Sequence, residues 1–188
     1  MNKIIVVEDE SIVRLDVVAM LEDAQFDVVA AVNNGEKAIE ATEQYKPDLI
    51  IMDIKMPKLD GLKASKIISK RYDIPILILT AYSQNEFIQQ AKQANIVGYI
   101  VKPIAESQLL PAVEIALSQA KQQFELKQKV TASYEAIEQR KCIEKAKGLI
   151  MERQNISEDK AYQKLRKLSM NHHTGIEQIA LKVIKQFG

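Results

Sequence analysis

The sequence predicts an α/β fold: a flavodoxin-like doubly wound sheet of five parallel strands, followed by a long helix and a small three-helix bundle. Four short runs of apolar, often β-branched residues predict strands at residues 3–7, 48–52, 75–79 and 98–101, and residues 26–32 supply a fifth. Longer stretches with helical spacing of apolar residues separate these runs. This alternation is typical of buried parallel strands with covering helices.

Helices are expected between the strands, at residues 11–24, 34–45, 61–72 and 83–95. A further helix begins near Ala105 and Glu106, and neither Gly nor Pro occurs between Pro111 and Gly148. Pro111 is tolerable in a first helical turn. Unbroken to Gln154, this helix would be roughly 70 Å long at 1.5 Å per residue. Such a rod exceeds the needs of a compact domain, so part of it is expected to be a linker or a dimer contact.

The long helix carries apolar residues in alternating steps of four and three, in two blocks: Val113, Leu117, Ala120 and Phe124, then Val130, Tyr134 and Ile137. Lys127 and Thr131 interrupt the repeat between the blocks. The spacing predicts a short or stuttered coiled coil. An exposed single helix is the alternative.

Two short helices follow and are expected to complete a three-helix bundle with the segment around Ile143, Ala146 and Ile150. Ser157 should cap the first of them, and its buried stripe would be Ala161, Leu165 and Leu168. Residues 174–177, Thr-Gly-Ile-Glu, form a capping-box pattern for the second helix. The apolar face of that helix comprises Ile176, Ile179, Ala180, Val183, Ile184 and Phe187.

Polar residues stand where the predicted strands end: Glu8 and Asp9 after the first, Asp53 after the third, Thr80 after the fourth and Lys102 after the fifth. Ligands of such sheets bind beyond the carboxyl ends of the strands, so these side chains should converge. Carboxylate oxygens suit Mg²⁺, and an aspartate can attack a phosphoryl group to form an acyl phosphate. A hydroxyl and an ammonium group would stabilise the phosphoryl oxygens.

These residue types, their placement and their order resemble the receiver domain of two-component response regulators, over residues 1–118. The resemblance implies that Asp53 accepts a phosphoryl group from a sensor histidine kinase. It also implies that Asp9 binds Mg²⁺ directly, Glu8 binds it through water, and Lys55 binds it through its backbone carbonyl.

The same resemblance assigns Thr80 and Lys102 to the phosphoryl oxygens. Tyr99, three residues before Lys102, matches the aromatic residue whose inward rotation accompanies movement of Thr80 in that family. Thr80 and Tyr99 are therefore the expected switch residues.

Residues 131–188 resemble the ANTAR domain, an RNA-binding antitermination module. The likeness is carried by Ala146-Lys147-Gly148, by Ala161-Tyr162 and by Leu165-Arg166. The preceding residues 119–140 are expected to be a helical linker or coiled coil that overlaps this domain. The whole-chain arrangement also resembles regulators of ethanolamine-utilisation operons in Gram-positive bacteria.

Four residues of this segment are candidate RNA contacts: Lys145, Lys147, Tyr162 and Arg166. An aromatic side chain and an arginine on a common helix face can stack on unpaired bases, while lysines contact phosphates. Gly148 inside a helix costs about 1 kcal/mol relative to alanine. A close backbone approach, to a packed helix or to RNA, is expected to compensate for that cost.

Charge is divided unevenly along the chain. Residues 1–118 hold 12 Lys and Arg against 17 Asp and Glu, a balance of −5, whereas residues 119–188 hold 14 against 8, a balance of +6. The split favours an acidic half that handles a cation and a basic half with an anionic partner. A single cysteine, Cys142, and the absence of any long apolar run predict a cytoplasmic protein with no membrane partner.

Together these patterns predict a response regulator, phosphorylated on Asp53, that dimerises on phosphorylation and binds hairpin RNA in a nascent mRNA leader as a transcription antiterminator. The alternative is a DNA-binding response regulator that controls transcription initiation. Against it, residues 176–187 are mostly apolar and resemble core packing more than a recognition helix. A protein-binding adaptor would leave the +6 balance unexplained. An enzymatic output is not expected, since no nucleophile–base pair follows residue 118.

Overall fold

The computed structural model describes residues 2–81 and 95–187 of the 188-residue chain. The chain divides into two compact units, Met1–Phe124 and Glu125–Gly188, which are described separately below. The helix predicted at residues 83–95 falls almost entirely outside the described residues.

The first unit is built on a five-stranded sheet with strand order β2-β1-β3-β4-β5. All four neighbouring pairs are parallel, which confirms the predicted flavodoxin-like fold. The strands are β1 (Lys3–Val7), β2 (Asp27–Val32), β3 (Leu49–Asp53), β4 (Ile76–Thr80) and β5 (Ile96–Val101). The apolar runs of β3 and β4 are buried throughout because helices cover both faces of the sheet.

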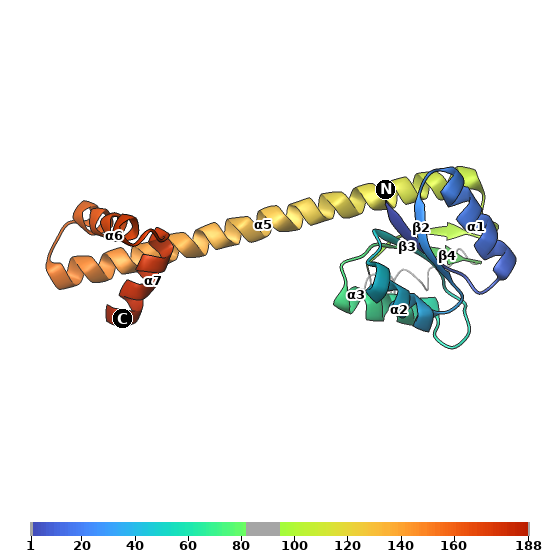
Figure 1. Cartoon of the computed structure of the whole chain (residues 1–188), viewed down its shortest axis with the longest axis horizontal. Helices are drawn as coiled ribbons and strands as arrows, with labels where there is room; N and C mark the ends of the chain where they lie inside the picture. Colours follow the sequence, from blue (N-terminus) through green and yellow to red (C-terminus); the bar gives the residue numbers. More distant parts are fainter. Residues whose placement is uncertain (1, 82–94, 188) are drawn as a thin grey trace. The chain divides into compact units, whose positions relative to one another are not determined.

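Two hydrophobic layers enclose this sheet (Figure 1). On one face, α1 (Ser11–Asp23) and the start of α5 (Glu106–Gln154) pack against alternate strand residues such as Val6 and Leu79. On the other face, α2 (Gly35–Tyr45) and α3 (Gly61–Arg71) lie side by side and cover the remaining ones. The period-two alternation of strand side chains therefore supplies both layers.

Helix α5 is continuous over 49 residues, about 74 Å at 1.5 Å per residue. Pro111 is its sixth residue rather than part of its first turn as predicted. Part of the first block of the predicted coiled-coil repeat packs within the first unit. Val113 is fully buried in a core of the five-stranded sheet, and Leu117 packs against the same core. The second block, together with Phe124 at the end of the first, remains exposed and available for a coiled coil.

The second unit is a three-helix bundle formed by the end of α5, α6 (Glu158–His172) and α7 (Ile176–Phe187), as predicted. Its buried core consists of Ala146, Ile150, Ala161, Leu165, Ile179, Ala180 and Val183. The predicted buried stripe of α6 is one residue too long, because Leu168 is 36% exposed. The last buried apolar residue of α6 is Leu165, one turn before Leu168.

Both predicted helix caps of this unit differ in detail. Ser157 stands at the N-cap of α6, but its side chain makes no capping hydrogen bond within the described residues. Helix α7 begins at Ile176, so Gly175 and not Thr174 precedes it, and the Gly175 carbonyl accepts the first helical hydrogen bonds. The Thr174 hydroxyl is buried and has no partner among the described residues. The capping box is therefore not formed.

Candidate functional site

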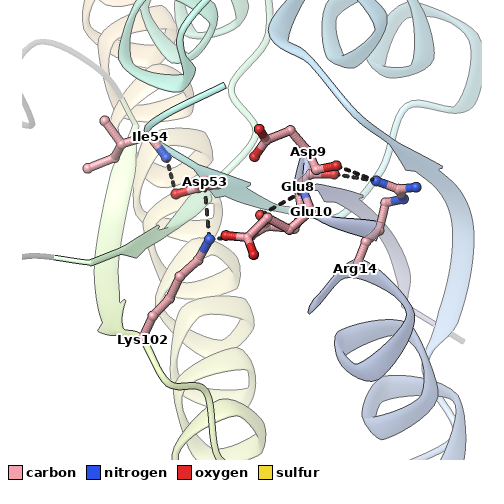
Figure 2. Close-up of polar contacts among 7 residues, drawn as sticks. All are labelled: Glu8, Asp9, Glu10, Arg14, Asp53, Ile54 and Lys102. Atoms are coloured by element: carbon pink, nitrogen blue, oxygen red, sulfur yellow. Dashed lines mark hydrogen bonds and ion pairs between the residues drawn. The ribbon is translucent and has the colours of Figure 1, made fainter. Parts of the chain in front are cut away.

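The carboxyl ends of four adjacent strands bring the predicted polar residues to one edge of the sheet (Figure 2). Glu8 and Asp9 follow β1, Asp53 ends β3, Thr80 ends β4, and Lys102 follows β5. Because β1, β3, β4 and β5 are neighbours in that order, residues distant in sequence meet here.

Three carboxylates form the acidic part of the site. One oxygen from each of Glu8, Asp9 and Asp53 lies within 4.8 Å of the others. Glu8 is fully buried and Asp53 is 5% exposed, whereas Asp9 is the most accessible of the three. Three negative groups at this spacing repel one another, so a positive charge is required among them.

Lys102 supplies that charge. Its Nζ lies 2.7 Å from Glu8 Oε2 and donates a hydrogen bond of 3.0 Å to Asp53 Oδ2. Burial raises the pKa of Glu8, although the Lys102 ammonium partly opposes this. For Lys102 itself burial would lower the pKa, but the hydrogen bonds and charges of Glu8 and Asp53 outweigh it and raise the pKa above its ordinary value. Lys102 is therefore charged at neutral pH.

Asp53 is held by the backbone that follows it. The Ile54 N–H donates to Asp53 Oδ1 at 2.7 Å, which leaves Oδ2 to face Lys102. The Gly61 N–H donates to the Ile54 carbonyl at 2.9 Å. A Cβ on Gly61 would lie 1.9 Å from the Asp53 carbonyl oxygen, so no side chain is tolerated there. Sequence reasoning missed Gly61, whose only signal is a lone glycine directly after the α3 cap, Asp60.

Lys55 and Thr80 lie with Asp9, Asp53 and Lys102 around a cavity of about 170 Å³. It is lined by Asp9, Glu10, Asp53, Ile54, Lys55, Thr80, Ala81 and Lys102. The Lys102 N–H donates to the Thr80 carbonyl at 2.8 Å, and the Lys102–Pro103 peptide bond is cis. Tyr99 does not line the cavity, and its side chain on β5 is 66% exposed.

The acidic cluster could hold a divalent cation such as Mg²⁺. Octahedral ligands about 2.1 Å from the ion lie about 3.0 Å apart when adjacent and about 4.2 Å apart when opposite. One oxygen from each of Glu8, Asp9 and Asp53 lies within 4.8 Å of the others, which brings the three carboxylates within reach of one cation. Asp9 and Asp53 line the cavity and could bind an ion directly, whereas Glu8 is not among the lining residues.

The second unit exposes three of the four predicted RNA contacts. Lys145 is exposed near the end of α5, and Tyr162 and Arg166 are exposed one turn apart on α6. The Ser169 hydroxyl on the same helix donates to the Thr174 carbonyl at 2.5 Å, so it holds the loop after α6.

The fourth predicted contact, Lys147, is held within the bundle. It is only 8% exposed and donates to Glu144 Oε1 at 2.8 Å and to Glu158 Oε1 at 2.6 Å. Hydrogen bonds to Glu144 and Glu158 raise its pKa. The bond to Glu158 ties α5 to the first turn of α6. A contact of Lys147 with RNA stays a prediction.

Gly148 does not pack closely within the chain, contrary to one of the two expectations for it. It is exposed, and nothing in the described structure lies within 4 Å of a Cβ built on it. No neighbouring helix therefore requires a glycine at this position.

We predict that Gly148→Ala raises the free energy of unfolding of the bundle by about 1 kcal/mol, because alanine favours the helix and meets no obstacle. Thermal unfolding of the full chain measures the effect. The matched control is Ala146→Gly, two residues earlier in the same helix and fully buried, which should lower the stability by about 1 kcal/mol or more. A destabilised Gly148→Ala variant would show that the glycine is needed within the chain.

None of the described helices combines the length and the apolar character needed to cross a membrane.

Comparisons with known proteins cover both units. Residues 4–114 match the family of response regulator receiver domains, and residues 133–184 match the ANTAR domain family. The transcriptional regulatory protein PdtaR of Mycobacterium tuberculosis is 34% identical over 187 residues, which span 100% of this chain and 91% of that protein. The chemotaxis protein CheY of Listeria monocytogenes is 32% identical over 117 residues, 62% of this chain and 98% of that protein.

Solved structures resemble the first unit. The chemotaxis protein CheY4 of Vibrio cholerae superimposes with a TM-score of 0.59 at 30% identity, covering 62% of this chain and 98% of that one. The receiver domain of a diguanylate cyclase from Desulfovibrio desulfuricans gives a TM-score of 0.61 at 28% identity, covering 65% and 98%.

Proposed function

The chain belongs to the response regulators, with a receiver domain followed by an ANTAR domain, and from this membership we propose that it is phosphorylated on Asp53 by a sensor histidine kinase and acts as an RNA-binding transcription antiterminator. We propose residues 1–118 as the receiver domain, residues 119–140 as a helical linker, and residues 131–188 as the RNA-binding domain that overlaps it.

The proposed phosphorylation step rests on the contact between Lys102 and Asp53 at the edge of the cavity. A carboxylate oxygen of Asp53 attacks the phosphorus of a phosphohistidine, the new O–P bond forms, and the imidazole nitrogen leaves with the electron pair of the broken N–P bond. Lys102, already within 3.0 Å of Asp53, stabilises the charge on the phosphoryl oxygens. Thr80, at the adjacent strand end, supplies a hydroxyl donor.

We assign Mg²⁺ binding to Asp9 and Asp53 directly, to Glu8 through water, and to the backbone carbonyl of Lys55. When bound, Mg²⁺ would neutralise the acidic cluster and a phosphoryl oxygen together. Without such neutralisation the carboxylates would repel an incoming phosphoryl group.

RNA binding is supported by the ANTAR match, by the positive balance of the C-terminal half, and by the exposed side chains of Lys145, Tyr162 and Arg166. DNA recognition by α7 is disfavoured, because Ile179, Ala180 and Val183 are buried in the bundle core. Most of its remaining apolar residues also pack against that core, although Gln178, Lys182 and Lys185 are exposed on the other face.

The test compares the full chain on a hairpin RNA and on duplex DNA of similar length and charge, with and without phosphorylation. We expect tighter binding to the hairpin, strengthened by phosphorylation, with an affinity that falls as salt rises. Equal or tighter binding to the duplex would instead support control of transcription initiation.

We also propose that phosphorylation promotes dimerisation through α5. The three apolar side chains of its second block, Val130, Tyr134 and Ile137, are 48 to 67% exposed. The beginning of the same helix contributes Leu109 and Val113 to the core that contains Leu79 and Ile100, from the strands that end at the phosphorylation site. A change at Thr80 or Tyr99 can therefore bias the packing of α5.

We predict that phosphorylation shifts the sedimentation of the chain from monomer towards dimer at a fixed protein concentration. Phosphorylation can shift this equilibrium only by its preference for one state. Val130→Glu should reduce the dimer fraction by placing like charges in the contact, whereas Gln128→Glu, which adds the same charge two residues away, is the control. Identical mass distributions of the phosphorylated and unmodified chains would contradict the proposal.

A further inference from the structure

Arg14 lies at the edge of the acidic site, although neither the family match nor the proposed chemistry assigns it a role. It is the fourth residue of α1. Its Nη1 donates to the Glu8 carbonyl at 2.6 Å and to the Asp9 carbonyl at 3.3 Å, and its Nη2 donates to Ser11 Oγ at 3.3 Å (Figure 2). One guanidinium group thus holds both of the backbone carbonyls that belong to the paired acids.

Besides the bonds from Arg14, the loop has one internal side-chain restraint, because the Glu10 N–H donates to Glu8 Oε1 at 3.3 Å. Only Glu8, Asp9 and Glu10 separate β1 from α1, and the N-cap residue Glu10 makes no side-chain capping bond within the described residues. The Glu8 N–H donates to the Val32 carbonyl at 3.0 Å, which fixes the beginning of the loop. Among the hydrogen bonds of the described residues, only the one from Arg14 reaches the Asp9 carbonyl.

The contacts of Arg14 go to backbone oxygens rather than to carboxylates. In the described part of the chain no carboxylate forms an ion pair with its guanidinium, so the acidic side chains stay available to a cation. The two carbonyls belong to the two peptide planes that flank the Asp9 Cα, so holding both restrains the backbone dihedral angles of Asp9. These two planes determine the direction in which the Asp9 side chain leaves the backbone, and its carboxylate lies with those of Glu8 and Asp53 in the acidic cluster.

We propose that Arg14 is a positioning residue for the divalent cation: it orients the Asp9 carboxylate by clamping the carbonyls of Glu8 and Asp9. This inference rests on the proposed Mg²⁺ site. An arginine is required because its planar fork reaches both carbonyls and Ser11 at once, whereas a lysine presents a single ammonium group. The side chain reaches back over the loop because helical side chains point towards the N-terminus.

The test measures the affinity of the unphosphorylated full chain for Mg²⁺ alone, by titration calorimetry. Loss of a group that orients a metal ligand typically lowers metal affinity by about 10- to 100-fold. We expect Arg14→Met, which keeps the apolar stem, to show such a loss, and Arg14→Lys to fall between it and the unaltered chain. Arg71→Met, which removes an exposed arginine at the end of α3, should leave the affinity unchanged.

A double-mutant cycle identifies the route of the effect. If Arg14 acts through Asp9, adding Arg14→Met to Asp9→Asn should weaken Mg²⁺ binding little further, so the two losses should not add. Full additivity, or an unchanged affinity in a folded Arg14→Met variant, would overturn the inference. A folded, unaltered chain that binds no Mg²⁺ would instead overturn the cation site itself. If Arg14→Met fails to fold, Arg14→Lys carries the same comparison.

Discussion

Asp53→Asn should abolish the incorporation of phosphate from a small phosphodonor in the presence of Mg²⁺, while the fold survives. The amide is nearly isosteric with the carboxylate but far less nucleophilic. Its one amide oxygen can still accept the hydrogen bond from the Ile54 N–H, so the end of β3 should remain packed. The hydrogen bond from Lys102 to Oδ2 is lost, but Lys102 keeps its ion pair with Glu8. Intact-mass spectrometry measures the modification, and thermal unfolding confirms that the variant is folded.

The matched control is Asp48→Asn, just before β3 at the opposite edge of the sheet, where the carboxylate accepts from the Lys3 N–H. This variant should incorporate phosphate to the level of the unaltered chain. Stoichiometric incorporation in Asp53→Asn would show that another residue is the acceptor.

Tyr162→Ala should weaken binding to a hairpin RNA by roughly 1–3 kcal/mol, the usual loss of one base–aromatic stack. Tyr162 is 45% exposed, so its ring can reach an unpaired base without unpacking the bundle. The dependence of affinity on salt should change little, because the phenol carries no charge. Lys145→Gln should instead reduce the salt dependence by about one phosphate contact.

Filter binding over a range of salt concentrations separates these two effects. The control is Tyr45→Ala at the end of α2, which removes a partly exposed tyrosine from the receiver domain and should leave RNA affinity unchanged. Unaltered RNA binding by a folded Tyr162→Ala variant would remove this residue from the interface.

The sheet could be predicted because its signal is local. Each strand, such as β3 with Ile50 and Ile51, is a short apolar run, and the side chains that follow it must meet at one edge once the strands are parallel. Strand-end position alone therefore indicated where Asp53 and Lys102 would come together. Their chemical roles remain proposals.

The details that the sequence does not predict are those set by tertiary contacts. Lys147 is a predicted phosphate contact, and the fold places Glu158 of α6 against it. Gly148 suggested a close approach of a packed helix or of RNA, and no neighbouring helix in the described part of the chain comes within 4 Å of a Cβ built on it. The positions of Arg14 and Gly61 could not be interpreted from the sequence. Arg14 donates to backbone carbonyls and Gly61 leaves room for one, so neither contact involves a second side chain that the sequence would reveal.

The strand order also bears on how the chain folds. β1 lies inside the sheet, but β5, at one edge, and the beginning of α5, with Leu109 and Val113, complete one of the two cores of the sheet. Almost the whole receiver domain must therefore be synthesised before its hydrophobic interior can close. The bundle draws its core from residues 142–187 alone, through contacts that are short in sequence. Since local helical contacts form faster than parallel strand pairing, the RNA-binding end should refold more rapidly than the part that receives the signal.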